Sequence, residues 1–329
     1  MSTLYITQQG AVVGKDGERI VVRKGKSVLA NLPALQVEQV VLYGNAHLTT
    51  PATAFLLDRG IDTVFLSRSG RFRGRLQGAV AAGAEVRQRQ YARASDPDVT
   101  LTIARDIVCG KIGNQARLCQ RRKAQGVLAK GVELDIVRQR AAAAPTAGAL
   151  MGHEGTASRL YFGALRDMLI EDWGFSGRVR RPPKDPVNVL LSLGYTFLYK
   201  DMLSAVHLVG LDPYIGFLHA PRPGHAALAS DLMEEFRTPI VDVVVQKVFN
   251  RNLVVREDFQ PDNAGLPRLS DRGFRAFAEE YQDRMATEVS HPDAGGQTPY
   301  RRTLELQARR MARALVEKQA RYIPFEMPR

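Results

Sequence analysis

A histidine and three acids follow one another in residues 219–237, HAPRPGHAALASDLMEEFR. Apolar residues recur there every four positions, which predicts an amphipathic helix that starts near Gly224. Asp231 and Glu234 are spaced i,i+3 on the flank of the apolar stripe, and Glu235 lies nearer to its buried edge. Carboxylates at this spacing repel one another unless a cation lies between them.

Two interpretations of these acids remain open on the segment alone. The acids can form a solvated turn beside Arg237, as charged clusters on helices commonly do. Alternatively, His219 and the helix carboxylates can bind a divalent metal ion. One nitrogen and several oxygen ligands suit Mn²⁺ or Mg²⁺ better than Zn²⁺, which usually binds more His or Cys.

Glu154 is a further candidate, within the helical pattern GHEGTASRLYFGALRDML. Apolar residues spaced by four predict the buried stripe of this helix, and they place Glu154 near its buried face in the first turn. A carboxylate there can ligate a metal, or it can simply favour the positive end of the helix dipole by about 0.5 kcal/mol. His153 is adjacent but points to another side of the helix.

The charge of the chain points to a polyanionic partner. Among its 329 residues, 46 Lys and Arg stand against 34 Asp and Glu, a formal net charge of +12. Such an excess most often indicates nucleic acid, with an anionic membrane surface as the second choice. A chain of this length can form two domains with a full core.

We expect no membrane-spanning segment and a cytoplasmic location. The most apolar run, VNVLLSLGYTFLY, ends at Lys200 and is shorter than the roughly 20 residues that a span needs. No basic and then apolar leader opens the sequence. Cys109 and Cys119 are expected to be small buried hydrophobic residues in a reducing compartment.

The patterning predicts an α+β protein, with a small β-rich N-terminal domain followed by a large all-α domain. Residues 1–78 contain short β-branched runs, a short helix in PATAFLLDRG, and a Gly/Arg-rich hairpin or edge strand in SGRFRGRLQG. Residues 79–98 resemble a linker that leads into a helix. Residues 99–329 repeat almost throughout at helical spacing.

Basic residues gather in four places: 68–75, 117–123, 178–184 and 301–321. Any one cluster can be the solvated face of an amphipathic helix or a phosphate contact. Four together favour nucleic acid, because Lys and Arg neutralise backbone phosphates and release counterions. The candidate DNA-binding residues are Arg178, Arg180, Arg181, Lys184, Arg237, Arg309 and Arg310.

Several motifs in a fixed order resemble one known family. They are QVEQVVLYGNAHLTTPATAFLLDRGIDTVFLSRSGRFRGRL, HEGTASRLYF, LLSLGYTFLY, GLDPYIGFLH, DLMEEFR and the closing RYIPFEMPR. Each is weak alone, but their order and spacing are similar to the CRISPR-associated integrase-endonuclease family of spacer acquisition. The likeness covers almost the full length.

The resemblance implies a β-domain followed by a helical domain, a homodimer, and a small partner protein of the CRISPR adaptation complex. It implies a metal-dependent DNA endonuclease and integrase that inserts new spacers into CRISPR arrays by 3′-hydroxyl attack on a repeat phosphodiester. The DNA would be double-stranded with single-stranded ends. We expect the β-rich first domain, residues 1–78, with its Gly/Arg hairpin at 69–78, to form the homodimer contact.

The resemblance also implies the site residues. Glu154, His219 and Glu234 would be catalytic and would ligate Mn²⁺ or Mg²⁺, with Asp231 as a supporting acid. Periodicity alone does not choose between Glu234 and Glu235. His225 departs from the Arg or Lys that relatives often carry after the glycine, which leaves open whether a second imidazole approaches the metal.

Two other functions compete with this one. A stand-alone metal-dependent repair nuclease would share the chemistry, but it would cut DNA without joining ends into a repeat. A non-catalytic DNA-binding protein would use the acids structurally and would show no metal-dependent activity.

Overall fold

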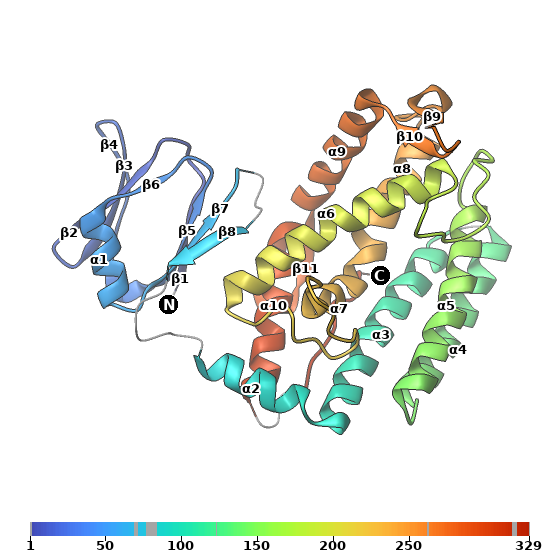
Figure 1. Ribbon diagram of the computed structural model, residues 1–329, viewed down its shortest axis with the longest axis horizontal. Coiled ribbons are helices and arrows are strands. Elements are labelled where there is room, and N and C mark those ends of the chain that lie inside the picture. Colours follow the sequence, from blue (N-terminus) through green and yellow to red (C-terminus); the bar gives the residue numbers. More distant parts are fainter. Residues whose placement is uncertain are drawn as a thin grey trace.

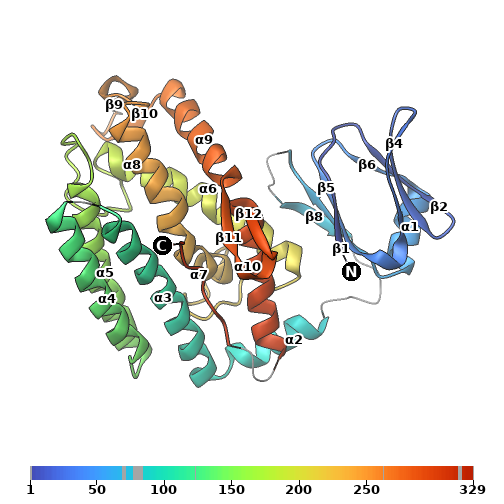
Figure 2. The same cartoon turned by 180° about the vertical axis from the view of Figure 1, so that it is seen from behind.

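Short β-branched runs at the start of the chain pair into two four-stranded sheets, seen together in Figures 1 and 2. The computed structural model describes residues 2–68, 72–76, 84–122, 124–261, 263–317 and 321–328. The first sheet has the strand order β1 (Ser2–Ile6), β5 (Val37–Tyr43), β7 (Asp62–Leu66), β8 (Phe72–Leu76). The second has the order β4 (Ser27–Pro33), β3 (Arg19–Lys24), β2 (Val12–Asp16), β6 (His47–Leu48).

The two sheets share one apolar core. Strands β1, β5 and β7 are parallel, and β8 is antiparallel to β7 at the edge of the first sheet. Helix α1 (Thr50–Asp58) adds Leu56 to a cluster that contains Val13 and Ile20 of one sheet and Val40 of the other. The expected β-rich start is confirmed. Strands β4 and β6 were not expected, because β4 has few β-branched residues and β6 is two residues long.

Helices make up most of the rest of the chain (Figure 1). Their bounds are α2 (Ala84–Ala94), α3 (Pro97–Gln120), α4 (Gln125–Ala142), α5 (Ala147–Asp167), α6 (Pro186–Val209), α7 (Ala227–Phe236), α8 (Val243–Asn250), α9 (Asp271–Ala286) and α10 (Tyr300–Val316). The predicted α+β class, with a helical second part, is therefore confirmed.

Short elements interrupt the helical region. Two antiparallel hairpins pair β9 (Phe259–Pro261) with β10 (Pro267–Leu269) and β11 (Glu288–His291) with β12 (Gly296–Pro299). Strands of three or four residues are too short for periodicity to reveal. The remaining elements are short helical turns at η1 (Ala34–Gln36), η3 (Arg256–Asp258) and η4 (Pro292–Ala294), and a π-helix, η2 (Arg237–Asp242).

Helix α2 occupies much of the stretch that resembled a linker, whose residues 79–83 lie outside the described ones. The buried side chain of Gln90 donates to the carbonyl oxygens of Asp212 and Ile215, each at 2.8 Å, and accepts the N–H of Asp212. Helix α2 therefore holds the loop that follows α6 as well as connecting the two parts.

The first sheet packs on the end of α6 and on α10. The ring of Phe72 on β8 stacks on His207, with centroids 4.1 Å apart. Gln39 on β5 donates to the Leu208 carbonyl at 2.6 Å, and Arg75 donates to the His207 carbonyl at 3.0 Å. The described part of the expected 69–78 hairpin is thus an edge strand against α6, while residues 69–71 and 77–78 lie outside the described ones.

Both cysteines of the sequence lie on α3 as free thiols. Cys119 is buried and Cys109 is half-buried. Within the described ranges, each helix is too short or too polar to cross a lipid bilayer.

Candidate active site

The ammonium group of Lys111 lies where three helices meet. Lys111 is on α3, and its Nζ is 2.5 Å from Glu154 Oε1 on α5 and 2.8 Å from Glu234 Oε2 on α7. All three side chains are largely or fully withdrawn from solvent. A buried carboxylate is costly unless a cation compensates it, so the lysine links two of the predicted site residues.

Arg237 supplies a second positive charge to Glu234. Its Nε is 3.0 Å from Glu234 Oε2, and its guanidinium lies over the Tyr195 ring, 4.4 Å from the centroid. Burial alone would raise the pKa of Glu234, but Arg237 and Lys111 outweigh burial and lower this pKa to about 2. Burial likewise lowers the pKa of Lys111, and the charges of Glu234 and Glu154 reverse that effect and leave it raised. Glu234 and Lys111 are therefore both charged at neutral pH.

Glu235 faces a different part of the molecule. Its carboxylate accepts hydrogen bonds from the Tyr322 hydroxyl, the Phe325 N–H and the Gln307 amide, close to the end of the chain. Burial raises the pKa of Glu235 to about 7. Consecutive helix residues point about 100° apart, and here this separation puts Glu234 alone on the Lys111 side.

Asp231 organises the loop that carries His219. Its Oδ2 accepts the N–H groups of Phe217 at 2.6 Å and Leu218 at 3.0 Å, and its Oδ1 accepts the His219 N–H at 2.9 Å. A Cβ on Gly216 would lie 2.6 Å from Asp231 Oδ2, so the close approach requires glycine. Asp231 is fully buried and fixes the backbone of this loop.

The imidazole of His219 is oriented by the same carboxylate. Nδ1 is 2.7 Å from Asp231 Oδ1, and Nε2 faces Glu234 Oε1 at 3.9 Å. Burial lowers the pKa of His219, but the hydrogen bond with Asp231 outweighs burial and leaves this pKa raised. His219 therefore lies beside the lysine-linked carboxylates with one ring nitrogen directed at Glu234.

The solvated-turn interpretation of the acids is wrong. Asp231, Glu234 and Glu235 are buried, as is every other residue of α7. The helix also begins at Ala227, later than expected, because Gly224 has a left-handed φ of +73° in the turn that precedes it.

Glu154 lies deeper in its helix than expected. Thr146 caps α5, which begins at Ala147, so Glu154 is about two turns from the N-terminus. The helix dipole acts mainly within the first turn. It therefore does not explain the carboxylate, and the contact with Lys111 does.

The π-helix η2 is held to two other helices of the site by buried hydrogen bonds. Helix α7 continues directly into η2 and then α8. At the end of η2, Asp242 accepts hydrogen bonds from the hydroxyls of Tyr161 and Tyr195, each at 2.6 Å. Tyr161 is on α5, which carries Glu154, and Tyr195 is on α6 and contacts Arg237. The buried carboxylate of Asp242 therefore links these two helices.

The second imidazole lies near the first. The rings of His225 and His219 are 6.3 Å apart between centroids. His225 Nε2 is 3.1 Å from the Ser230 hydroxyl, and the ring stacks parallel to Tyr199. These contacts hold His225 beside the site without directing it at the carboxylates.

The donor types suit a hard divalent cation, namely two carboxylates and one imidazole nitrogen from three elements. Within the described part of the chain, however, no three His, Cys, Asp or Glu side chains are grouped as a metal site requires. The ammonium of Lys111 instead occupies the position between Glu154 and Glu234 that a shared cation would take. The chemistry of the donors fits the metal, and its binding stays a prediction.

The predicted DNA-binding residues divide into two groups. Arg180, Arg181 and Lys184 are exposed in the segment before α6. The others make internal contacts: Arg178 with Asn188 and Ser192, Arg237 with Glu234, Arg309 with Glu305, Thr3 and Gln39, and Arg310 with Asp293. Their positive charge is therefore at least partly used within the fold.

Lys111 was missed in the sequence. It lies in IVCGKIGN, a stretch of small and apolar residues that reads as an ordinary buried helix. A single lysine in such a stretch is itself the available signal, because a buried ammonium requires an acidic partner. Its partners are 43 and 123 positions away in sequence, beyond the reach of any local pattern.

We predict that Glu235 gives the protein a pH-dependent stability. A carboxyl whose pKa rises from 4.5 to about 7 on folding holds its proton longer in the folded state, so stability falls as pH rises between these values. Relative to Glu235→Gln, the wild type should lose on the order of 3 kcal/mol between pH 4 and pH 8. Urea unfolding of both proteins across this range measures the difference. Parallel pH curves for the two would contradict the assignment.

Comparison with known proteins identifies the family. A family model described as CRISPR associated protein Cas1 matches residues 4–283. One CRISPR-associated endonuclease Cas1 of Thermus thermophilus is 39% identical to this chain over 98% of both chains. A second one from the same organism is 36% identical over 99% of this chain and 97% of the relative. A chain in a solved structure described as a partial Cas6-RT-Cas1–Cas2 complex has a TM-score of 0.81 and 28% identity, covering 100% of this chain and 99% of that one. The resemblance seen in the sequence is confirmed, and the chain belongs to the Cas1 family of CRISPR-associated proteins.

Proposed function

We propose that this protein is a metal-dependent DNA endonuclease and integrase that inserts spacers into CRISPR arrays, acting in the cytoplasm. The observation that carries the proposal is that Glu154 and Glu234 share the ammonium group of Lys111 in a Cas1-family chain, with His219 Nε2 3.9 Å from Glu234 Oε1. The endonuclease names of the Thermus thermophilus relatives support the same class of activity.

The proposed reaction is the attack of a DNA 3′-hydroxyl on a phosphodiester of the repeat. A new P–O bond forms to the incoming strand, and the bond to the repeat's own 3′-oxygen breaks. With water as the nucleophile, the same site hydrolyses DNA. Glu154, His219 and Glu234 would hold Mn²⁺ or Mg²⁺, which would stabilise charge on the phosphoryl group and favour deprotonation of the nucleophile.

Other residues would prepare the site for this chemistry. Asp231 fixes the His219 ring through Nδ1, which leaves Nε2 directed toward Glu234. Arg237 keeps Glu234 ionised, as a metal ligand must be. The Arg237 guanidinium lies over the ring of Tyr195, and the Tyr195 hydroxyl donates a hydrogen bond to the buried Asp242. These contacts fix the position of Arg237.

We predict that Glu154→Gln and Glu234→Gln each lower Mn²⁺-dependent cutting and joining at least about 100-fold. The amide preserves shape and hydrogen bonding but not the negative charge that a hard cation requires. Cleavage of a labelled duplex with single-stranded ends, and joining of its ends into a repeat-containing plasmid, measure the two activities. Glu235→Gln on the same helix is the matched control and should retain both. Wild-type rates in either site variant would reject the ligand assignment, and cutting without joining in the wild type would favour the repair nuclease.

Lys111 should compete with the metal, because both need the same two carboxylates. We predict that Lys111→Met lowers the thermal midpoint of the metal-free protein by roughly 5–10 °C, since it leaves Glu154 without its cation and Glu234 with Arg237 alone. The same change should tighten Mn²⁺ binding, measured by electron paramagnetic resonance of the free ion.

Lys130→Met is the control for this prediction. Lys130 pairs with Asp167 across a partly exposed contact between α4 and α5, so its loss should change neither quantity much. Weaker Mn²⁺ binding in Lys111→Met would show that the lysine belongs to the metal-loaded site and does not compete with it.

We further propose a homodimer that works with a small partner protein, as joining both ends of a spacer needs two sites at a fixed separation. The solved structure similar to this chain is described as containing Cas2 beside Cas1, which supports such a partner. The expected 69–78 hairpin is a weaker candidate for the dimer contact, because β8 already packs on α6. The sheet edge formed by β4 and the following η1 is a better one within the same domain, since Val28 and Leu29 of β4 and Leu35 of η1 are 56%, 48% and 82% exposed.

We predict that Leu29→Asp converts the dimer to a monomer without unfolding it, because a buried charge disrupts an interface while an exposed one is tolerated in the free chain. Sedimentation velocity measures the change. Ser27→Asp adds the same charge to the same strand at a polar, exposed position and should leave the dimer intact. A wild type that sediments as a monomer even with DNA would contradict the dimer altogether.

A further inference from the structure

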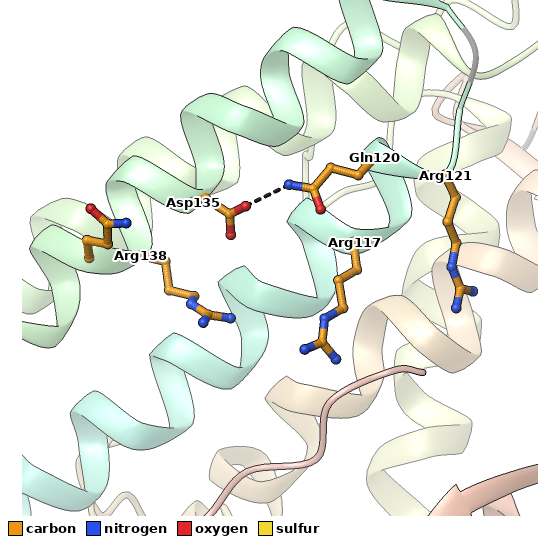
Figure 3. Close-up of a pocket in the computed structure, with 6 residues that line it drawn as sticks. Arg117, Gln120, Arg121, Asp135 and Arg138 are labelled. Atoms are coloured by element: carbon orange, nitrogen blue, oxygen red, sulfur yellow. Dashed lines mark hydrogen bonds between the residues drawn. The ribbon is translucent and has the colours of Figure 1, made fainter. Parts of the chain in front are cut away.

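Helices α3 and α4 line an open pocket of about 590 Å³ (Figure 3). It is lined by Arg117, Gln120, Arg121, Asp135, Arg138 and Gln139. The guanidinium groups of Arg117 and Arg138 point toward each other from the two helices in Figure 3. The basic cluster noted in the sequence at 117–123 thus contributes two arginines to a pocket that the carboxylate site does not explain.

An oxyanion of the chain itself contacts two of these arginines. The carboxylate of Glu326 pairs with Arg117, and its Oε1 is 3.4 Å from Arg138 Nη1. Asp135 on α4 accepts a hydrogen bond from Gln120 on α3 at 2.6 Å. With Arg121 included, three guanidinium groups face two carboxylates, so a net positive charge remains.

The backbone of α3 is shaped to admit one of these arginines. A Cβ on Gly113 would lie 2.5 Å from Arg138 Nη1, so any other residue would push the guanidinium away. Gly113 is two positions from Lys111 on the same helix, and Arg117 is six positions from it. Six residues of α-helix rise about 9 Å and turn by well over one full turn, so the pocket lies near the carboxylate site along the helix axis but on another side of α3.

We propose that this pocket binds a phosphodiester group of a nucleic acid strand, and that Glu326 is an internal anion which the phosphate displaces. Converging guanidinium groups match the oxygens of a phosphate as they match a carboxylate. The proposal rests on the proposed function, because the strand would belong to the DNA on which the carboxylate site acts.

A purely structural role for the arginines makes a different prediction. Arg117 and Arg121 also donate to the carbonyl oxygens of Met327 and Pro328, so their loss could loosen the end of the chain. Arg138 is the better residue to change, since its 3.4 Å contact with Glu326 is near the outer limit of a hydrogen bond. If the arginines only fasten the chain end, Arg138 should have little effect on DNA.

The test measures binding of a fluorescein-labelled duplex with single-stranded 3′ ends, by anisotropy in EDTA over a range of NaCl concentrations. Arg138→Gln should weaken binding roughly three- to tenfold and lower the slope of log affinity against log salt by about 0.7–0.9, the value of one phosphate contact. Glu326→Gln should strengthen binding about threefold, because it removes the competing charge. Arg140→Gln, an exposed arginine on the same helix outside the pocket, is the matched control and should leave the slope unchanged.

Three outcomes would overturn the proposal. Equal salt slopes for Arg138→Gln and Arg140→Gln would show that Arg138 does not contact a phosphate. Unchanged or weaker DNA binding by Glu326→Gln would show that Glu326 does not compete with the phosphate. Calorimetry with inorganic pyrophosphate supplies the third: loss of pyrophosphate binding in Arg138→Gln with no effect on DNA would assign the pocket to free polyphosphate. DNA binding is measured without metal, so it tests the pocket separately from catalysis. A wild type that binds DNA as expected but never cuts it would contradict the proposed function and would still support the phosphate-binding pocket.

Discussion

Two carboxylates buried among helices need a cation between them, and Lys111 provides it. Withdrawing each carboxylate from water costs several kcal/mol unless an opposite charge compensates. Helices α3, α5 and α7 can therefore pack closely only while the charge at their meeting point is balanced. A metal ion that satisfied Glu154 and Glu234 would keep the helices in place as the ammonium does. The same constraint thus stabilises the fold, and under the proposed function a metal ion would take the place of the ammonium.

The elements around this point are fixed by buried polar contacts more than by apolar packing alone. Asp231 accepts three successive backbone N–H groups from the loop before α7, and Gln90 of α2 holds the start of that loop. Asp242 binds two tyrosines from two other helices. Buried polar groups that are fully satisfied impose one arrangement on their neighbours, whereas apolar contacts tolerate sliding. This explains how a histidine on an irregular loop keeps its orientation.

The sequence predicted the two-part architecture and the residues of the site, but by different routes. Periodicity and β-branched runs were enough for the architecture, since these follow local preferences. Glu154, His219 and Glu234 came from the family resemblance, because periodicity could not separate Glu234 from Glu235. The separation depends on the end of the chain returning to Glu235, a contact 90 residues away in sequence. Lys111 was missed for the same physical reason, as its partners are brought to it only by the tertiary fold.

Residues 325–327 contact both the helix that carries Glu234 and the arginine pocket between α3 and α4. Around Asn114 on α3, the backbone of residues 325–327 is fixed by hydrogen bonds to Asn114, and the Phe325 N–H reaches Glu235. The side chain of Glu326, between these anchored residues, turns instead toward the arginine pocket. Because the backbone bonds do not involve that side chain, an anion could replace the Glu326 carboxylate while the segment stays attached to α3. Glu235 would then keep its partners, so occupation of the pocket need not disturb the helix that carries Glu234.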